Sequence, residues 1–141
     1  MSKKMKAITV PAALNQLDNV LDFVNSELAE YNCSVKLQTQ VAIAVEEIFV
    51  NIAHYAYNPQ IGEATVQCEV DGDPLHITIQ FLDGGKPYNP LDREDPDTTL
   101  PAEERDIGGL GVYLVKKSMD ALSYEYKDGK NILTIQKIVQ G

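Results

Sequence analysis

Basic residues are scarce in this sequence. Its 141 residues include 12 Lys and Arg against 21 Asp and Glu, a formal net charge of −9. So acidic a chain lacks the basic surface that binds nucleic acid or an anionic membrane. We therefore expect no direct nucleic-acid partner and no membrane partner.

Cysteine and long apolar runs are also scarce. Cys33 and Cys68 lie far apart without Cys-x-x-Cys spacing, and neither His54 nor His76 has a second ligand at zinc-site spacing. No apolar run approaches the roughly 18 residues of a membrane span, and the start Met-Ser-Lys-Lys-Met-Lys lacks the apolar stretch of a signal peptide. We expect a reduced cytoplasmic protein.

What the chain does contain is enough apolar sequence for one core. Apolar residues make up 44% of it, so we predict a single domain over residues 1–141. Spacings of three and four predict helices, and alternation predicts strands. The predicted helices span about residues 17–31, 36–57 and 109–119, and the predicted strands 8–10, 64–70, 75–82, 122–126 and 131–138.

This order of elements predicts an α+β fold. Two helices precede most of the strands, and one helix comes late. The arrangement is typical of a two-layer α/β sandwich, with a mainly antiparallel mixed sheet and helices on one face.

A polar stripe interrupts the second predicted helix. At about 100° per residue, Glu47, Asn51 and His54 fall within about 60° of one another, whereas Glu46 lies about 100° from Glu47. An Asn oxygen suits Mg²⁺, and a carboxylate one turn away is suited to accept a proton during phosphoryl transfer. The alternative is a solvated helical face, with His54 in a structural role.

A second motif, Asp83-Gly84-Gly85-Lys86-Pro87, follows an apolar strand. A carboxylate at a buried strand end needs donors, and the exocyclic amine of adenine is one. Gly85 would let a flat ring approach the backbone, and Pro87 stiffens the exit. The alternative is an ordinary Asp-Gly turn.

The third motif, Gly108-Gly109-Leu110-Gly111, opens the late helix. Free amides and the macrodipole at a helix start favour phosphate. No Gly-Lys-Ser/Thr follows, which excludes a P-loop, and an acidic loop precedes it, which excludes a Rossmann fingerprint. The alternative is a glycine-rich helix start without a ligand.

Together the three motifs predict one ATP site. Because the chain is acidic, a polyanionic nucleotide would bind through Mg²⁺ and backbone amides.

At these residues the sequence resembles the GHKL (Bergerat-fold) ATPases, and within them the anti-sigma factor serine/threonine kinases of bacteria. The resemblance implies the Bergerat ATP-binding fold, with Glu47 as catalytic base and Asn51 as the Mg²⁺ ligand. It further implies an ATP lid at about residues 90–107. The implied nucleotide-binding residues are Asn51, His54, Asp83, Gly85, Pro87, Gly108, Gly109, Leu110, Gly111 and Thr134.

The same resemblance implies a function. An ATP- and Mg²⁺-dependent kinase would phosphorylate a small antagonist protein of the anti-anti-sigma type, and would sequester a sigma factor, as a homodimer. The alternatives are a non-catalytic, nucleotide-gated binding module, a detached histidine kinase catalytic domain, and an interaction protein that has lost its nucleotide.

Overall fold

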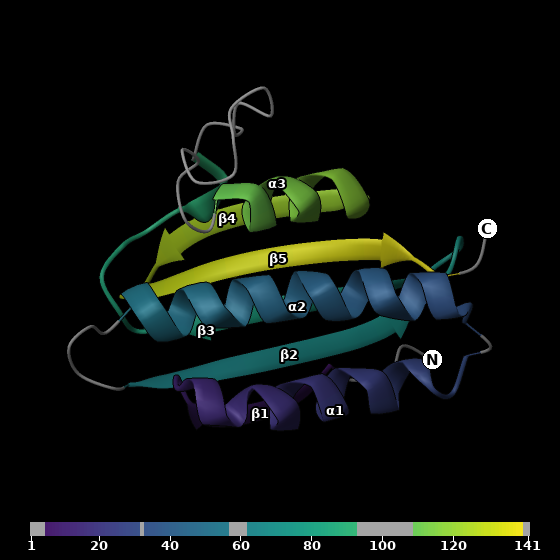
Figure 1. The fold of residues 1–141 in the computed structure, drawn as a ribbon, viewed down its shortest axis with the longest axis horizontal. Helices are drawn as coiled ribbons and strands as arrows, with labels where there is room; N and C mark the ends of the chain where they lie inside the picture. Colours follow the sequence, from purple (N-terminus) through teal and green to yellow (C-terminus); the bar gives the residue numbers. More distant parts are fainter. Residues whose placement is uncertain (1–4, 32, 57–61, 93–108, 140–141) are drawn as a thin grey trace.

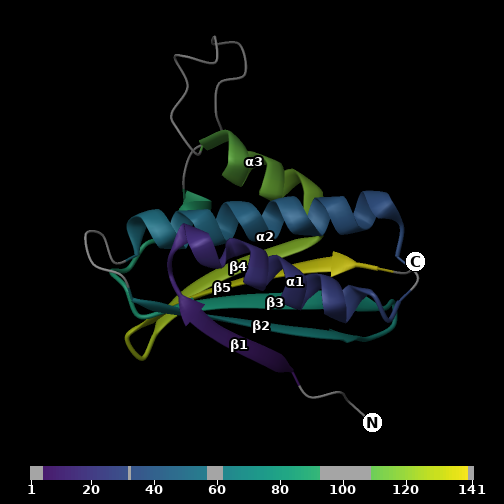
Figure 2. The same cartoon turned by 60° about the horizontal axis from the view of Figure 1, so that its bottom comes forward.

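The computed structural model describes residues 5–31, 33–56, 62–92 and 109–139. These residues form two layers, a five-stranded sheet and a layer of helices on one of its faces (Figure 1, Figure 2). The elements are, in chain order, β1 (Lys6–Pro11), η1 (Leu14–Gln16), α1 (Leu17–Leu28), α2 (Val35–Tyr55), β2 (Glu63–Asp71), β3 (His76–Asp83), η2 (Pro90–Asp92), α3 (Gly109–Ser118), β4 (Ala121–Lys127) and β5 (Lys130–Ile138).

The strands follow the order β1-β2-β3-β5-β4. Tight turns join β2 to β3 and β4 to β5, and the second turn has positive φ at Asp128 and Gly129, as hairpin turns of this kind require. The α+β sandwich is therefore confirmed. The sheet is antiparallel at every pairing of the described strands, so the prediction of a mixed sheet was wrong in that detail.

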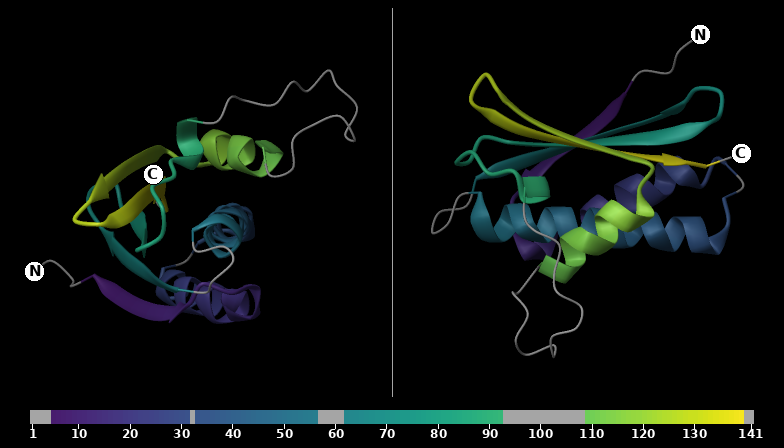
Figure 3. Two further views of the ribbon diagram at one scale, coloured as in Figure 1. Left: turned by 90° about the vertical axis from the view of Figure 1, so that its left-hand side faces the viewer. Right: turned by 90° about the horizontal axis from the view of Figure 1, so that it is seen from above.

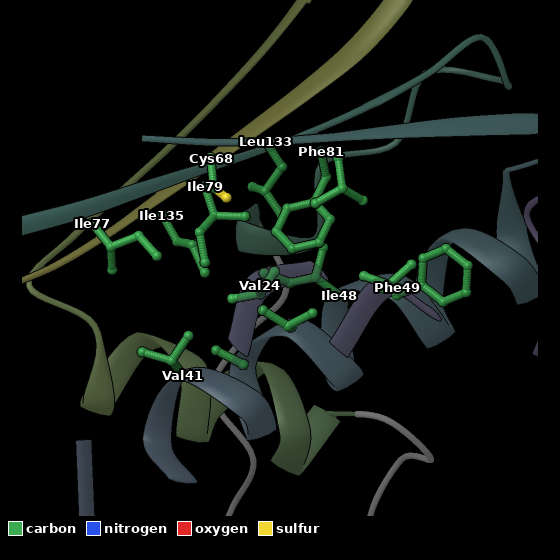
Figure 4. Close-up of a cluster of buried hydrophobic side chains, with 14 of the residues drawn as sticks. Val24, Val41, Ile48, Phe49, Cys68, Ile77, Ile79, Phe81, Leu133 and Ile135 are labelled. Atoms are coloured by element: carbon green, nitrogen blue, oxygen red, sulfur yellow. The ribbon is translucent and has the colours of Figure 1, made fainter. Parts of the chain in front are cut away.

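The core lies between the two layers. Along β3 the inward residues Ile77, Ile79 and Phe81 are buried and alternate with half-buried ones, the pattern of a sheet with one face covered. Figure 4 shows the side chains of the sheet facing those of α1 and α2. The same alternation turns Asp83, the last residue of β3, toward the helices.

Helix α2 lies between α1 and α3 in the helix layer (Figure 3). Its start is capped by Ser34, whose hydroxyl accepts a hydrogen bond from the backbone of Leu37 at 3.1 Å, which satisfies one of the free amides of the first turn. Val41, Val45 and Phe49 belong to the core and are fully buried. This packing holds the polar stripe of α2 at a fixed height above the sheet.

Most of the predicted lid lies outside the described residues, which include only its first part, Pro90–Asp92. Among the described residues, none of the helices is both long enough and apolar enough to cross a membrane.

Candidate functional site

Four ends of elements meet on one side of the molecule. Figure 1 shows at its left the C-terminal end of α2, the end of β3, the start of β5 and the start of α3. A cavity lies here, which we call the inner cavity. Its lining residues are Ile48, Asn51, Ile52, Ala56, Phe81, Asp83, Lys86, Tyr88, Pro90, Tyr124, Asn131 and Leu133.

The inner cavity combines apolar walls with a few convergent polar groups. Ile48, Phe81 and Leu133 provide buried apolar surface. Asp83, Asn131 and Asn51 are the buried polar residues of the described chain, and all three line this cavity. Apolar walls with a small number of placed polar groups are typical of a small-molecule binding site.

Only one of the two carboxylate oxygens of Asp83 accepts hydrogen bonds from described residues. Its Oδ1 accepts hydrogen bonds from the backbone N–H of Gly85 at 3.0 Å and from Nδ2 of Asn131 at 2.9 Å. No described residue donates to Oδ2. A buried carboxylate oxygen needs a donor, and an exocyclic amine of a bound ring would supply one.

Gly85 packs against the end of α2. A Cβ on this residue would lie 2.2 Å from the carbonyl oxygen of Ala56, and the next residue, Lys86, donates its N–H to that same oxygen at 3.1 Å. The missing side chain therefore permits close contact between the loop and the helix. This differs from the sequence-based reason, in which the glycine made room for a ring.

Asn51 joins the inner cavity to a second one, the outer cavity. The lining residues of the outer cavity are Glu47, Ile48, Asn51, Pro90, Leu91, Val115, Leu122 and Leu133. The Asn51 side chain is 8% exposed, and no described residue forms a hydrogen bond with it. A buried amide without a partner is costly.

The side-chain oxygen of Asn51 is a suitable ligand for Mg²⁺. Among the described residues, no cluster of three or more His, Cys, Asp or Glu could hold a metal by itself. Mg²⁺ is commonly held by one or two protein oxygens, while phosphates and waters supply the rest. The orphaned oxygen of Asn51 at the junction of the two cavities meets that requirement.

Glu47 reaches the outer cavity from the same helix. It is half-buried and Glu46 is exposed, so the structure separates the two adjacent carboxylates as the helical geometry predicted. Burial raises the pKa of Glu47 above its usual value, and the neighbouring charge of Glu46 raises it further. Both effects make the Glu47 carboxylate a stronger base.

The glycine-rich motif begins α3 as predicted. Gly109 is the first residue of that helix, and Leu110 and Gly111 belong to its first turn, where backbone amides lack helical partners. Gly108 lies outside the described residues. Further along α3, Val115 lines the outer cavity, so the helix packs beside the Glu47 and Asn51 side chains.

Four of the predicted site residues are absent from the lining of both cavities: His54, Gly85, Pro87 and Thr134. His54 and Pro87 are exposed, and neither lines the inner or the outer cavity. Thr134 lies on the other face of the sheet, where its hydroxyl accepts a hydrogen bond from Gln80 at 3.3 Å. In β5 the residues facing the helices are Asn131, Leu133 and Ile135, so alternation excludes Thr134 from the site.

Asn131 is the site residue that the sequence reasoning missed. A signal was present, because Asn131 occupies the same side of the alternating strand as two apolar residues, Leu133 and Ile135. A polar residue at such a position is buried and needs partners. Its cross-strand neighbour is Asp83, which only the register of the sheet reveals.

The sequence matches one protein family over most of its length. Residues 10–137 match the family described as histidine kinase-like ATPase domain. The serine/threonine-protein kinase BtrW of Bordetella bronchiseptica is 23% identical over 135 residues, which cover 96% of this chain and 94% of BtrW. The serine-protein kinase RsbW of Bacillus cereus is 30% identical over 98 residues, which cover 68% of this chain and 61% of RsbW.

Solved structures share the fold. A crystal structure of the RsbU and RsbW domains of Rv1364c from Mycobacterium tuberculosis superposes with a TM-score of 0.66 at 14% identity, over 96% of this chain and 32% of that one. The histidine kinase domain of the blue-light activated histidine kinase EL346 from Erythrobacter litoralis gives a TM-score of 0.53 at 15% identity, over 99% of this chain and 70% of that one.

Replacing Gly85 with alanine tests the contact between the loop and α2. The added Cβ collides with the Ala56 carbonyl, so we expect Gly85→Ala to lower the free energy of unfolding by about 1–3 kcal/mol. Urea denaturation followed by circular dichroism measures this change. The control is Gly84→Ala at the exposed neighbouring position, and equal stability of the two variants would contradict the assignment.

Proposed function

The chain belongs to the histidine kinase-like ATPase domain family, and we propose that it is an ATP-dependent protein serine/threonine kinase of the anti-sigma factor type. The observation that carries this proposal is the arrangement of Asn51. Its buried amide has no partner among the described residues, and it stands between the mainly apolar inner cavity and the half-buried carboxylate of Glu47.

In this proposal ATP spans the two cavities. Adenine occupies the inner cavity between apolar side chains, with its amine donating to Oδ2 of Asp83. The phosphates extend toward the outer cavity and the first turn of α3, whose free amides favour anions. Asn51 would hold Mg²⁺, which neutralises phosphate charge during phosphoryl transfer. With Mg²⁺ held in this way, so acidic a chain, with a net charge of −9, would be able to bind a polyanion.

Glu47 acts as the general base. Its carboxylate accepts the proton of a serine or threonine hydroxyl on the acceptor protein while the oxygen of that hydroxyl forms a bond to the γ-phosphorus. The bond from that phosphorus to the β,γ-bridging oxygen breaks, and ADP leaves. Burial and Glu46 raise the pKa of Glu47, which brings the base closer to neutral pH and strengthens it.

The partners in this proposal follow from the relatives. BtrW and RsbW carry the names of serine or serine/threonine protein kinases, and a domain named RsbW shares this fold. We propose that the acceptor is a small antagonist protein of the anti-anti-sigma type, that the second partner is a sigma factor, and that the kinase is a cytoplasmic homodimer.

Glutamine at position 47 tests the kinase mechanism. Glu47→Gln keeps the shape of the side chain but removes the base, so we expect phosphoryl transfer to fall by about 100-fold or more while ATP affinity stays nearly unchanged. Transfer of radiolabelled phosphate to a cognate antagonist and calorimetric titration of ATP measure the two quantities.

The matched control for this experiment is Glu46→Gln on the exposed side of the same helix, which should retain transfer at neutral pH. Undiminished transfer by Glu47→Gln would show that the base is assigned wrongly. Binding of ATP by the unmutated protein without any transfer would favour the nucleotide-gated module instead.

The pH profile tests the electrostatic coupling between the two glutamates. Because Glu47 acts as a base only when ionised, kcat should fall as the pH drops through its raised pKa, at a higher pH than the usual Glu value of about 4.3. Removing the neighbouring charge in Glu46→Gln lowers the pKa of Glu47, so the acidic limb of the profile should move to lower pH. Identical limbs in both proteins would exclude Glu47 as the titrating group.

Removal of Asn51 tests the metal ligand. We expect Asn51→Ala to weaken ATP binding in Mg²⁺ by about tenfold, the size of one strong contact, and to change little in a chelator. Calorimetry in both conditions measures the difference. Asn51→Asp, which keeps an oxygen ligand, should preserve the dependence on Mg²⁺. An equal loss with and without the metal would refute the role of Asn51.

A further inference from the structure

Asn131 uses every hydrogen-bonding position of its side chain. Its Nδ2 donates to Oδ1 of Asp83 and to the carbonyl oxygen of Lys86, both at 2.9 Å. Its Oδ1 accepts from the backbone N–H of Tyr88 at 3.1 Å and from the hydroxyl of Tyr124. An asparagine side chain offers two donated hydrogens and two lone pairs, so Asn131 is fully satisfied.

These four partners define the orientation of the amide. The two neighbours of Nδ2 are acceptors, and the two neighbours of Oδ1 are donors. Rotating the amide by 180° would place its oxygen against the oxygens of Asp83 and Lys86, and its NH₂ group against the N–H of Tyr88. Asn131 therefore presents its donor to Asp83 in one arrangement only.

The consequence for Asp83 is that its two oxygens become different. Oδ1 is saturated by Asn131 and by the Gly85 amide. Oδ2 is the oxygen without a described donor, and Asp83 is 6% exposed, so water reaches it poorly. The carboxylate is locked with its free acceptor available to a ligand in the inner cavity.

The same residue holds the loop that borders the cavity. The contacts of Asn131 to Lys86 and Tyr88 tie that loop to β5, while the Lys86 N–H ties it to α2 at the Ala56 carbonyl. Tyr124, on β4, completes the network and also lines the cavity. Asn131 thus connects the acceptor, the loop and the sheet edge.

We propose that Asn131 is the positioning residue that makes the inner cavity select a purine bearing an amine at C6. The inference rests on the proposed binding of ATP. A free carboxylate oxygen accepts from the amine of adenine, whereas guanine presents a carbonyl oxygen at that position and would be repelled. Without Asn131, Oδ2 of Asp83 is no longer held toward the cavity and the preference for the amine is lost.

The test compares two nucleotides in each protein by calorimetric titration with Mg²⁺. ATP has the C6 amine, and purine riboside triphosphate lacks it and is otherwise identical. We expect the unmutated protein to bind ATP about tenfold more tightly, the size of one hydrogen bond to a charged acceptor. In Asn131→Ala we expect ATP to bind about tenfold more weakly while the affinity for the analogue changes little. The ratio of the two dissociation constants, that of the analogue over that of ATP, therefore approaches one.

Two further variants keep the test decisive. Tyr124→Phe removes a single hydrogen bond to Asn131 and should lower the ratio by about threefold. This smaller change tests the inference even if Asn131→Ala fails to fold. Gln136→Ala is the matched control, because Gln136 lies on the other face of β5, where it donates to Thr78 at 3.2 Å. It should leave the ratio unchanged.

The outcomes separate the inference from the function on which it rests. If Asn131→Ala and Tyr124→Phe weaken both nucleotides in equal proportion, or leave the ratio as it was, Asn131 has only a structural role and the inference is overturned. If the unmutated protein binds neither nucleotide, the proposed function fails and this inference fails with it. A ratio that collapses in Asn131→Ala but not in Gln136→Ala supports the assignment.

Discussion

The packing of α2 against the inner face of the sheet is the constraint on which the rest of the structure depends. Phe49 from the helix and Phe81 from β3 are fully buried in this layer. Burial of such side chains contributes about 1.5–3 kcal/mol each, so the helix cannot rotate or slide without losing this packing. The register that results brings Asn51 and Glu47 of the helix beside the ends of β3 and β5, where the two cavities form.

The site is built at the edge of the apolar core. Asn131 donates to Oδ1 of Asp83 across the β3–β5 pair, while Oδ2 of Asp83 and the side chain of Asn51 have no partner among the described residues. A buried polar group without a hydrogen bond lowers stability. The fold tolerates this cost at the position where the proposed metal and nucleotide would supply the missing contacts, as functional sites commonly do.

The acidic character of the chain and its proposed ligand are compatible for a local reason. In the proposal, the phosphates would meet the neutral side chain of Asn51 and the backbone amides of the first turn of α3. The carboxylate of Glu47, which burial and Glu46 make more basic, accepts a proton in the proposed reaction. The net charge of −9 therefore does not describe the local charge at the proposed phosphate site.

Hydrophobic periodicity alone determined the helices, the strands, the two-layer class and the polar stripe with Glu47 and Asn51, because these features depend on residues close together in the chain. The start of α3 at Gly109 and the strand-end position of Asp83 were predicted for the same reason. The tertiary structure decided what depends on cross-strand register. It placed Asn131 opposite Asp83, turned Thr134 to the other face and set Gly85 against Ala56. A shift of one residue in register exchanges the two faces of a strand, and no local pattern specifies which distant residues will meet.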